Sequence, residues 1–243
     1  MALEVEHATS PHHSPRYGVP ICMIVIHYTG SNNLDGTLSW FADPQSRVSS
    51  HFVVGKLASH DGDFARVVQI VPLEHKSYHA GASQWLVDDD LYELTKLNGM
   101  RWNLPLREKK RLVTNVNSCS VGIELVGTGD LFPELQMRTT ANLVRRLMTD
   151  NPWIRRSAVV GHDQVAIPPG RKDDPGPSFD WGLLWSLVDD IALPMFSRVS
   201  HVTPVPIAPV EPEWMEAGIE PLRARSLAWW RSISARFQKL GIG

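Results

Sequence analysis

A continuous apolar run at residues 21–26 (ICMIVI) constrains the fold of this chain more than any other feature. A short uninterrupted run rich in β-branched residues indicates a strand that is buried on both faces of a sheet. A strand with one face in water would instead alternate apolar and polar residues. The run ends abruptly at His27. The sequence therefore predicts a sheet covered on both sides, with a histidine at the end of an inner strand.

The rest of the chain alternates strand-like and helix-like segments. We expect further strands at residues 51–55, 66–71, 120–126 and 157–161, and helices at residues 37–42, 135–149 and 181–191. This order predicts an α/β fold with a central mixed β-sheet flanked by helices. The chain is 43% hydrophobic and 21% charged, which is typical of a folded core. Its formal charge of −2 provides no global basic field, so we expect no nucleic-acid partner.

Changes in composition divide the chain into three parts. Residues 1–19 are polar and are expected to form a flexible N-terminal arm, followed by one main domain at 20–193. Within that domain, clustered acidic and basic residues predict a surface insertion at 86–117. Residues 194–243 are expected to form a proline-rich linker and a basic amphipathic helix at 221–240. That helix would dock on the domain or on a second subunit, or would contact a membrane surface or a cell wall.

Cysteine content and hydropathy predict the cellular compartment of the protein. Only Cys22 and Cys119 are present, and we expect both to be buried thiols in a reducing compartment. The first twenty residues lack the apolar stretch of a secretory leader, and no run approaches the roughly 18 apolar residues of a membrane span. These features predict a cytoplasmic chain without a transmembrane segment.

Two histidines and one aspartate form a candidate metal site. His27 and His162 each stand where an apolar strand gives way to a loop, the edge at which open α/β sheets place ligands. Pro175 disfavours helical backbone at Asp174, so Lys172 and Asp174 are expected to project the same way from an extended segment. Two imidazoles and one carboxylate are a ligand set of catalytic zinc, which keeps its fourth position for water. The sequence therefore predicts a Zn²⁺ site at His27, His162 and Asp174.

Glu124 is an ionisable residue in an otherwise apolar strand. It shares a face with Gly122, which leaves room for another group to approach. Burial of a carboxylate is costly unless it is partnered, so one interpretation is an ion pair, for example with an arginine. The other is a general base beside the metal, with a pKa raised by desolvation.

Five stretches of the sequence resemble those of a known protein family. The matching stretches are MIVIHYTG (23–30), SSHFVVG (49–55), VQIVPLEHKSYHAGASQW (68–85), SVGIELVG (120–127) and VVGHDQVAIPPGRKDDPGPSFDW (159–181). In this order they resemble the type-2 N-acetylmuramoyl-L-alanine amidases of the AmpD and peptidoglycan recognition protein superfamily. The arm, the insertion and everything after about residue 195 lie outside the resemblance.

The resemblance implies a role for each matching residue. His27, His162 and Asp174 would bind zinc, Glu124 would act as catalytic acid and base, and Lys172 would stabilise the oxyanion. Asp173 offers a competing carboxylate, although the Asp-Pro-Gly context favours Asp174. His51 would be structural or would support a ligand. The residues expected to bind substrate are His79, Ala80 and Trp85, which would line the groove, and Arg171, which could pair with a stem-peptide carboxylate or remain a solvated loop cation.

The implied function is zinc-dependent hydrolysis of the amide between the lactyl group of N-acetylmuramic acid and L-alanine. Its partners would be peptidoglycan or (anhydro)muropeptides, in cell-wall recycling or degradation. One alternative is a non-catalytic peptidoglycan-binding module, since the superfamily contains such receptors. The other is a phage-type endolysin that acts on intact cell wall. The full set of candidate site residues favours an enzyme over a receptor.

Overall fold

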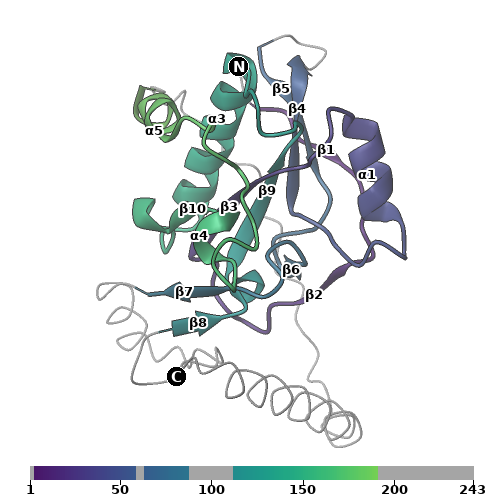
Figure 1. The fold of residues 1–243 in the computed structure, drawn as a ribbon, viewed down its shortest axis with the longest axis vertical. Helices are drawn as coiled ribbons and strands as arrows, with labels where there is room; N and C mark the ends of the chain where they lie inside the picture. The colour runs from purple at the N-terminus through teal and green to yellow at the C-terminus, as the bar shows by residue number, and fades with distance from the viewer. Residues whose placement is uncertain (1–2, 59–62, 88–111, 191–243) are drawn as a thin grey trace, which may run out of the picture. The chain divides into compact units, whose positions relative to one another are not determined.

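A six-stranded mixed sheet forms the centre of the domain (Figure 1). The computed structural model describes residues 3–58, 63–87 and 112–190. Neighbouring strands of the sheet run parallel except for the antiparallel pair β4 and β5. This architecture confirms the predicted mixed sheet. The strands in spatial order are β1 (Glu6–His7), β5 (Ala65–Gln69), β4 (Phe52–Ala58), β9 (Ser120–Leu125), β3 (Met23–Tyr28) and β10 (Val159–Gly161).

Helices cover both faces of the sheet because its inner strands are apolar on both sides. Helices α3 (Glu134–Asp150) and α5 (Trp181–Asp190) pack on the face that carries Ile24, Ile26 and Ile123. Helix α1 (Leu34–Ala42) packs on the opposite face, where Phe41 contacts the cluster that contains Val53. Figure 1 shows α3 and α5 on one side of the strands and α1 on the other. The site described below lies on the α1 side.

The N-terminal segment corrects the sequence-based prediction of a flexible arm. Strand β1 adds in parallel to the edge strand β5, and β2 (His13–Pro15) pairs antiparallel with β6 (His75–Ser77). The Arg16 side chain enters the interior, where Arg16 is only 6% exposed. Its guanidinium donates to the carbonyl oxygens of Leu73, Asn117, Ser118 and Ser120. Short strands at a sheet edge need few apolar residues, so hydropathy gave no sign of this pairing.

The expected surface insertion at 86–117 is wrong at both of its ends. Strands β7 (Gln84–Leu86) and β8 (Leu112–Thr114) form an antiparallel pair. The 3-10 turn η1 (Val116–Ser118) follows, and Val87, Val113 and Val116 are buried in one apolar cluster with Cys22 and Cys119. The charged clusters between them lie at 88–111, outside the described residues. Both cysteines are buried thiols, as predicted.

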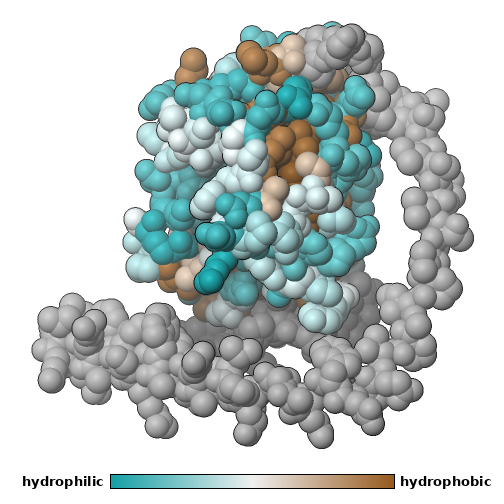
Figure 2. Space-filling model, turned by 90° about the vertical axis from the view of Figure 1, so that its right-hand side faces the viewer, coloured by the Kyte–Doolittle hydropathy of each residue, from teal (hydrophilic) through white to brown (hydrophobic). Residues whose placement is uncertain are grey.

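Two predicted segments near the C-terminus cannot be compared with the structure because they lie outside the described residues. The chain divides into two units, 1–196 and 197–243, and only the first contains described residues. The predicted linker and the helix at 221–240 therefore lie outside them. Within the described ranges, no helix combines the length and apolar character needed to cross a bilayer. On the described surface seen in Figure 2, hydrophilic residues predominate and apolar residues gather in small patches.

Candidate active site

The site forms where the parallel strands β3, β9 and β10 end at the same edge of the sheet. His27 lies in β3 directly opposite Glu124 in β9. Gly161 of β10 pairs with Ile26, so the next residue, His162, lies level with His27 at the start of the one-turn helix α4 (His162–Val165). The segment after α4 brings Asp174 back to this edge, where the Asp174 carbonyl accepts from the Asp163 backbone N–H. Tertiary structure thus joins residues 147 positions apart in the chain.

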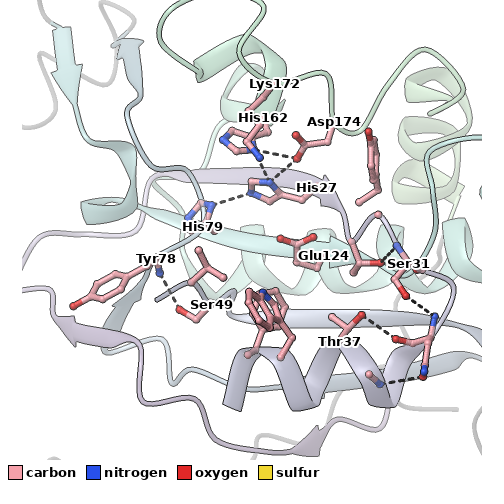
Figure 3. A pocket seen from close by; sticks show the side chains of 18 of the residues that line it. His27, Ser31, Thr37, Ser49, Tyr78, His79, Glu124, His162, Lys172 and Asp174 are labelled. Atoms are coloured by element: carbon pink, nitrogen blue, oxygen red, sulfur yellow. Dashed lines mark hydrogen bonds and ion pairs between the residues drawn. The ribbon is translucent and has the colours of Figure 1, made fainter. Parts of the chain in front are cut away.

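Three donor atoms converge at this edge (Figure 3). Asp174 Oδ2 lies 2.8 Å from His27 Nδ1 and 3.0 Å from His162 Nδ1, and the two Nδ1 atoms are 3.1 Å apart. Tetrahedral zinc with bonds of about 2.0–2.2 Å separates its ligand atoms by roughly 3.4 Å, so a small outward movement would seat the ion. All three residues are buried, at 2%, 2% and 6% exposure. The donor set fits a divalent transition metal such as zinc.

The protonation states at this site suit a cation. Burial lowers the pKa of His27 to about 4, so its imidazole is neutral near pH 7. Burial by itself would raise the pKa of Asp174, but hydrogen bonds with His162 and His27 hold that pKa below its usual range. Neutral imidazoles and an ionised carboxylate are the forms in which these side chains bind metals.

Glu124 is a buried carboxyl group beside this cluster. Burial raises the pKa of Glu124 well above its usual value, the charge of Asp174 raises it further, and Lys172 opposes the shift. No side chain in the described part of the chain hydrogen-bonds the Glu124 carboxylate, which gives no support to the ion-pair interpretation. The space beside Gly122 is filled by the His79 ring, because a Cβ added at Gly122 would lie 2.6 Å from His79 Cγ.

A cavity of about 600 Å³ opens onto the cluster. Glu124 and Lys172 both line it, together with the three candidate metal ligands. Trp40 and Phe41 of α1 line the wall on the helix side, and Trp40 is 53% exposed. Sequence patterns did not indicate this wall, and their only signal was a tryptophan in the helix expected at 37–42. The close-up in Figure 3 shows Glu124 between the histidine–aspartate cluster and α1.

The four residues expected to bind substrate have different surroundings in the structure, and only His79 lines the cavity. His79 lines the cavity and also contacts a candidate ligand, since its Nδ1 lies 2.9 Å from His27 Nε2. Ala80 is fully buried, and its carbonyl accepts from His162 Nε2 at 3.0 Å. Trp85 lies in β7 and packs against the cluster around Cys22. Arg171 donates to the carbonyls of Ile167, Ala80 and Ala82.

Ala80, Trp85 and Arg171 are not among the residues that line this cavity. The Ala80 carbonyl and the Arg171 guanidinium form hydrogen bonds with other groups of the protein. Asp173, the competing carboxylate, accepts from the Tyr28 hydroxyl at 3.1 Å and is not part of the converging group. His51 is fully buried away from the cavity, and its Nδ1 accepts from the Gly122 backbone N–H.

Comparisons with known proteins agree with this geometry. The family model described as N-acetylmuramoyl-L-alanine amidase matches residues 17–177. The N-acetylmuramoyl-L-alanine amidase AmiD of Escherichia coli is 29% identical over 205 residues, which cover 77% of this chain and 63% of AmiD. This chain thus spans less than two thirds of AmiD. The 1,6-anhydro-N-acetylmuramyl-L-alanine amidase AmpD of Salmonella typhimurium SL1344 is 31% identical over 162 residues, or 66% of this chain and 68% of that protein.

Solved structures show the same fold. A crystal structure of an AmpD derivative superposes with a TM-score of 0.52 at 26% identity and covers 77% of this chain and 96% of that one. Escherichia coli AmiD in complex with anhydro-N-acetylmuramic acid-L-Ala-D-γ-Glu-L-Lys gives a TM-score of 0.51 at 27% identity, covering 74% of this chain and 60% of AmiD. With its cavity, its buried glutamate and its histidine–aspartate cluster, the chain belongs to the N-acetylmuramoyl-L-alanine amidase family.

Proposed function

We propose that this chain is a zinc-dependent amidase that cleaves the bond between the lactyl group of N-acetylmuramic acid and L-alanine. One observation carries the proposal: three buried donor atoms within 3.1 Å of one another open onto the cavity that Glu124 and Lys172 line. A receptor that only held peptidoglycan would need neither a buried carboxyl group with a raised pKa nor its neighbouring ligand set.

His27, His162 and Asp174 would hold the metal through His27 Nδ1, His162 Nδ1 and Asp174 Oδ2. Zinc bound there supplies a Lewis acid that polarises the amide carbonyl and lowers the pKa of a coordinated water to about 7. Three protein donors leave room in a four-coordinate site for that chemistry. The Asp173 carboxylate, held by Tyr28, would remain outside the ligand set.

Glu124 supplies the proton transfers in this proposal. Its carboxylate takes a proton from the attacking water and returns it to the departing amine of L-alanine, so the proton is conserved across the two steps. Its raised pKa brings proton donation closer to neutral pH than an ordinary glutamate allows. Lys172 lines the same cavity and would face the oxygen that becomes negative as the carbonyl turns tetrahedral.

We further propose that the preferred substrate is a soluble anhydromuropeptide and that the chain acts in cytoplasmic cell-wall recycling. Supporting this, the AmpD relatives are named 1,6-anhydro-N-acetylmuramyl-L-alanine amidases, and the AmiD neighbour was solved with an anhydro-N-acetylmuramic acid peptide. The basic segment at 221–240 remains a candidate for peripheral membrane or wall contact. Action on intact cell wall, as by an endolysin, is the competing substrate assignment.

Two substrates assayed side by side test this proposal. Purified full-length protein with measured zinc content is incubated with 1,6-anhydromuropeptide and with intact sacculi, and released stem peptide is quantified by chromatography and mass spectrometry. We expect rapid release from the soluble substrate and slow release from sacculi. Preference for sacculi would replace recycling with wall degradation. Binding of either substrate without release, at full zinc occupancy, would refute the enzyme assignment.

A further inference from the structure

The outer nitrogens of both candidate histidine ligands contact the same two-residue segment. His27 and His162 turn their Nδ1 atoms toward Asp174, which leaves Nε2 of each ring on the far side. His162 Nε2 donates to the Ala80 carbonyl at 3.0 Å, and His27 Nε2 lies 2.9 Å from His79 Nδ1. Figure 3 shows His79 next to His27, on the side away from Asp174. Adjacent residues 79 and 80 thus serve both rings.

Once a metal replaces the contacts between the Nδ1 atoms and Asp174, these outer contacts match the tautomer that metal binding requires. A carbonyl oxygen only accepts, so His162 carries a proton on Nε2, and Nδ1 is the nitrogen whose lone pair would bind a metal. For His27 to present an Nδ1 lone pair as well, its Nε2–H must donate to His79 Nδ1. His79 then carries its own proton on Nε2, which lies 2.9 Å from Ser120 Oγ. Each hydrogen bond in this series, from Ser120 through His79 to His27, then has one donor and one acceptor.

The 79–80 segment is itself held in place from several directions. The Ala80 backbone N–H donates to Asn117 Oδ1 at 2.9 Å, and Arg171 donates to the Ala80 and Ala82 carbonyls at 3.0 and 2.7 Å. The ring of His79 crosses that of His27 nearly at a right angle, 84°, with centroids 5.0 Å apart. Gly122 has no side chain to displace the His79 ring, which a Cβ would contact at 2.6 Å.

We propose that His79 is a positioning residue that fixes the tautomer and orientation of His27, and that the Ala80 carbonyl does the same for His162. This inference rests on the proposed zinc site and changes the role of His79 from substrate contact to support of a ligand. Partners of this kind typically contribute 10- to 100-fold in metal affinity. Arg171 belongs to the same arrangement because it fixes the Ala80 carbonyl.

Isosteric substitutions separate positioning from substrate binding. In His79→Asn, the amide oxygen replaces Nδ1 and still accepts from His27; in His79→Gln, the amide matches the Nε2 position instead. We expect His79→Asn to keep zinc affinity within about threefold of the unchanged protein, while His79→Gln and His79→Ala lose about 10- to 100-fold. Gly122→Ala, which displaces the ring without altering a ligand, should lose affinity as well. Tyr78→Ala, at the neighbouring loop position, is the matched control and should keep it.

Zinc affinity is measured on full-length protein by competition with a chromophoric chelator, and the visible spectrum of the Co²⁺-loaded protein reports ligand geometry. Urea unfolding of each metal-free variant verifies that it is folded. At saturating zinc, a positioning role leaves KM near its original value, whereas a substrate contact at His79 would raise KM with affinity unchanged. Equal zinc affinity in folded His79→Asn, His79→Gln and His79→Ala would overturn the positioning role of His79 but leave the proposed zinc site intact. Failure of the unsubstituted protein to bind zinc would overturn the proposed zinc site as well.

Discussion

Replacing Glu124 with glutamine should make the protein more stable and nearly inactive. The substitution keeps the shape of a side chain that is only 9% exposed and removes its ability to ionise. Loss of a positioned general acid and base typically costs 10²- to 10⁴-fold in rate, or about 3–5 kcal/mol of transition-state stabilisation. Glu124→Gln should therefore lower kcat by this factor while the zinc content stays unchanged.

The stability change follows from the direction of the pKa shift. The pKa of Glu124 is raised by burial, so the folded protein holds this proton more tightly than the unfolded chain does. The free energy of unfolding then falls as pH rises from about 4.5, the usual pKa, toward the raised pKa. Each unit of raised pKa corresponds to about 1.4 kcal/mol at pH values above both. Glutamine removes this cost, so Glu124→Gln should gain stability at neutral pH relative to acid pH.

Two measurements on the same preparations test this expectation. Stem-peptide release from 1,6-anhydromuropeptide gives kcat at matched zinc occupancy, and urea unfolding of the metal-free proteins at pH 4.5 and pH 7.5 gives stability. Glu124→Ala is the comparison variant, since it loses activity as well but leaves a void. If Glu124→Gln lost stability at pH 7.5, the carboxylate would be a structural ion-pair partner. If it kept its activity, the catalytic role would be refuted.

The remaining predictions concern the metal, the buried residues Arg16 and His51, and the cavity wall. Asp174→Ala should lose both zinc and turnover, and added zinc should not restore either; retained zinc by elemental analysis would contradict the ligand assignment. Arg16→Met leaves several buried carbonyls without their donor and should lower the free energy of unfolding by at least about 3 kcal/mol in urea titrations, whereas a flexible arm would give no change. Burial and the charge of Arg16 lower the pKa of His51 to about 3. At pH values below the usual pKa of about 6.5, this histidine is therefore protonated in the unfolded chain but stays neutral in the folded protein. His51 alone should contribute a fall in stability of up to about 1.4 kcal/mol per pH unit between about 6.5 and 3, so His51→Asn should make the measured slope shallower by that amount; an unchanged slope would exclude the contribution of His51. Trp40→Ala should raise KM for anhydromuropeptide with little change in zinc affinity, and an unchanged KM would show that the α1 wall does not contact substrate.

Hydrophobic periodicity predicted the centre of the fold well. The apolar run before His27 and the largely apolar strand around Glu124 became the adjacent strands β3 and β9, and the helix expected at 135–149 became α3. The strand does not stop at His27, however, but continues to Tyr28. Burial on both faces is encoded in consecutive residues, which is why such strands can be recognised locally.

Features that depend on partners distant in the chain were not predictable. Residues 3–19 read as a flexible arm because their strands are short and polar, and only the presence of β5 and β6 makes them pair. The resemblance placed Ala80 in the groove and left Arg171 as a contact of the stem peptide or a solvated loop cation. In the structure the Arg171 guanidinium donates to the Ala80 carbonyl, which also accepts from His162 Nε2. Such roles depend on which polar groups become buried together.

The sequence by itself determined the inner strands, the helices that cover them and the residue types needed for the proposed zinc-dependent amidase chemistry. These depend on side-chain character and spacing along a single segment. Tertiary structure alone decided that His27, His162 and Asp174 point their donor atoms at one position, and that His79 faces a ligand rather than only the cavity. Distances of about 3 Å between residues so far apart in the chain are set by strand register and loop packing, which no local pattern encodes.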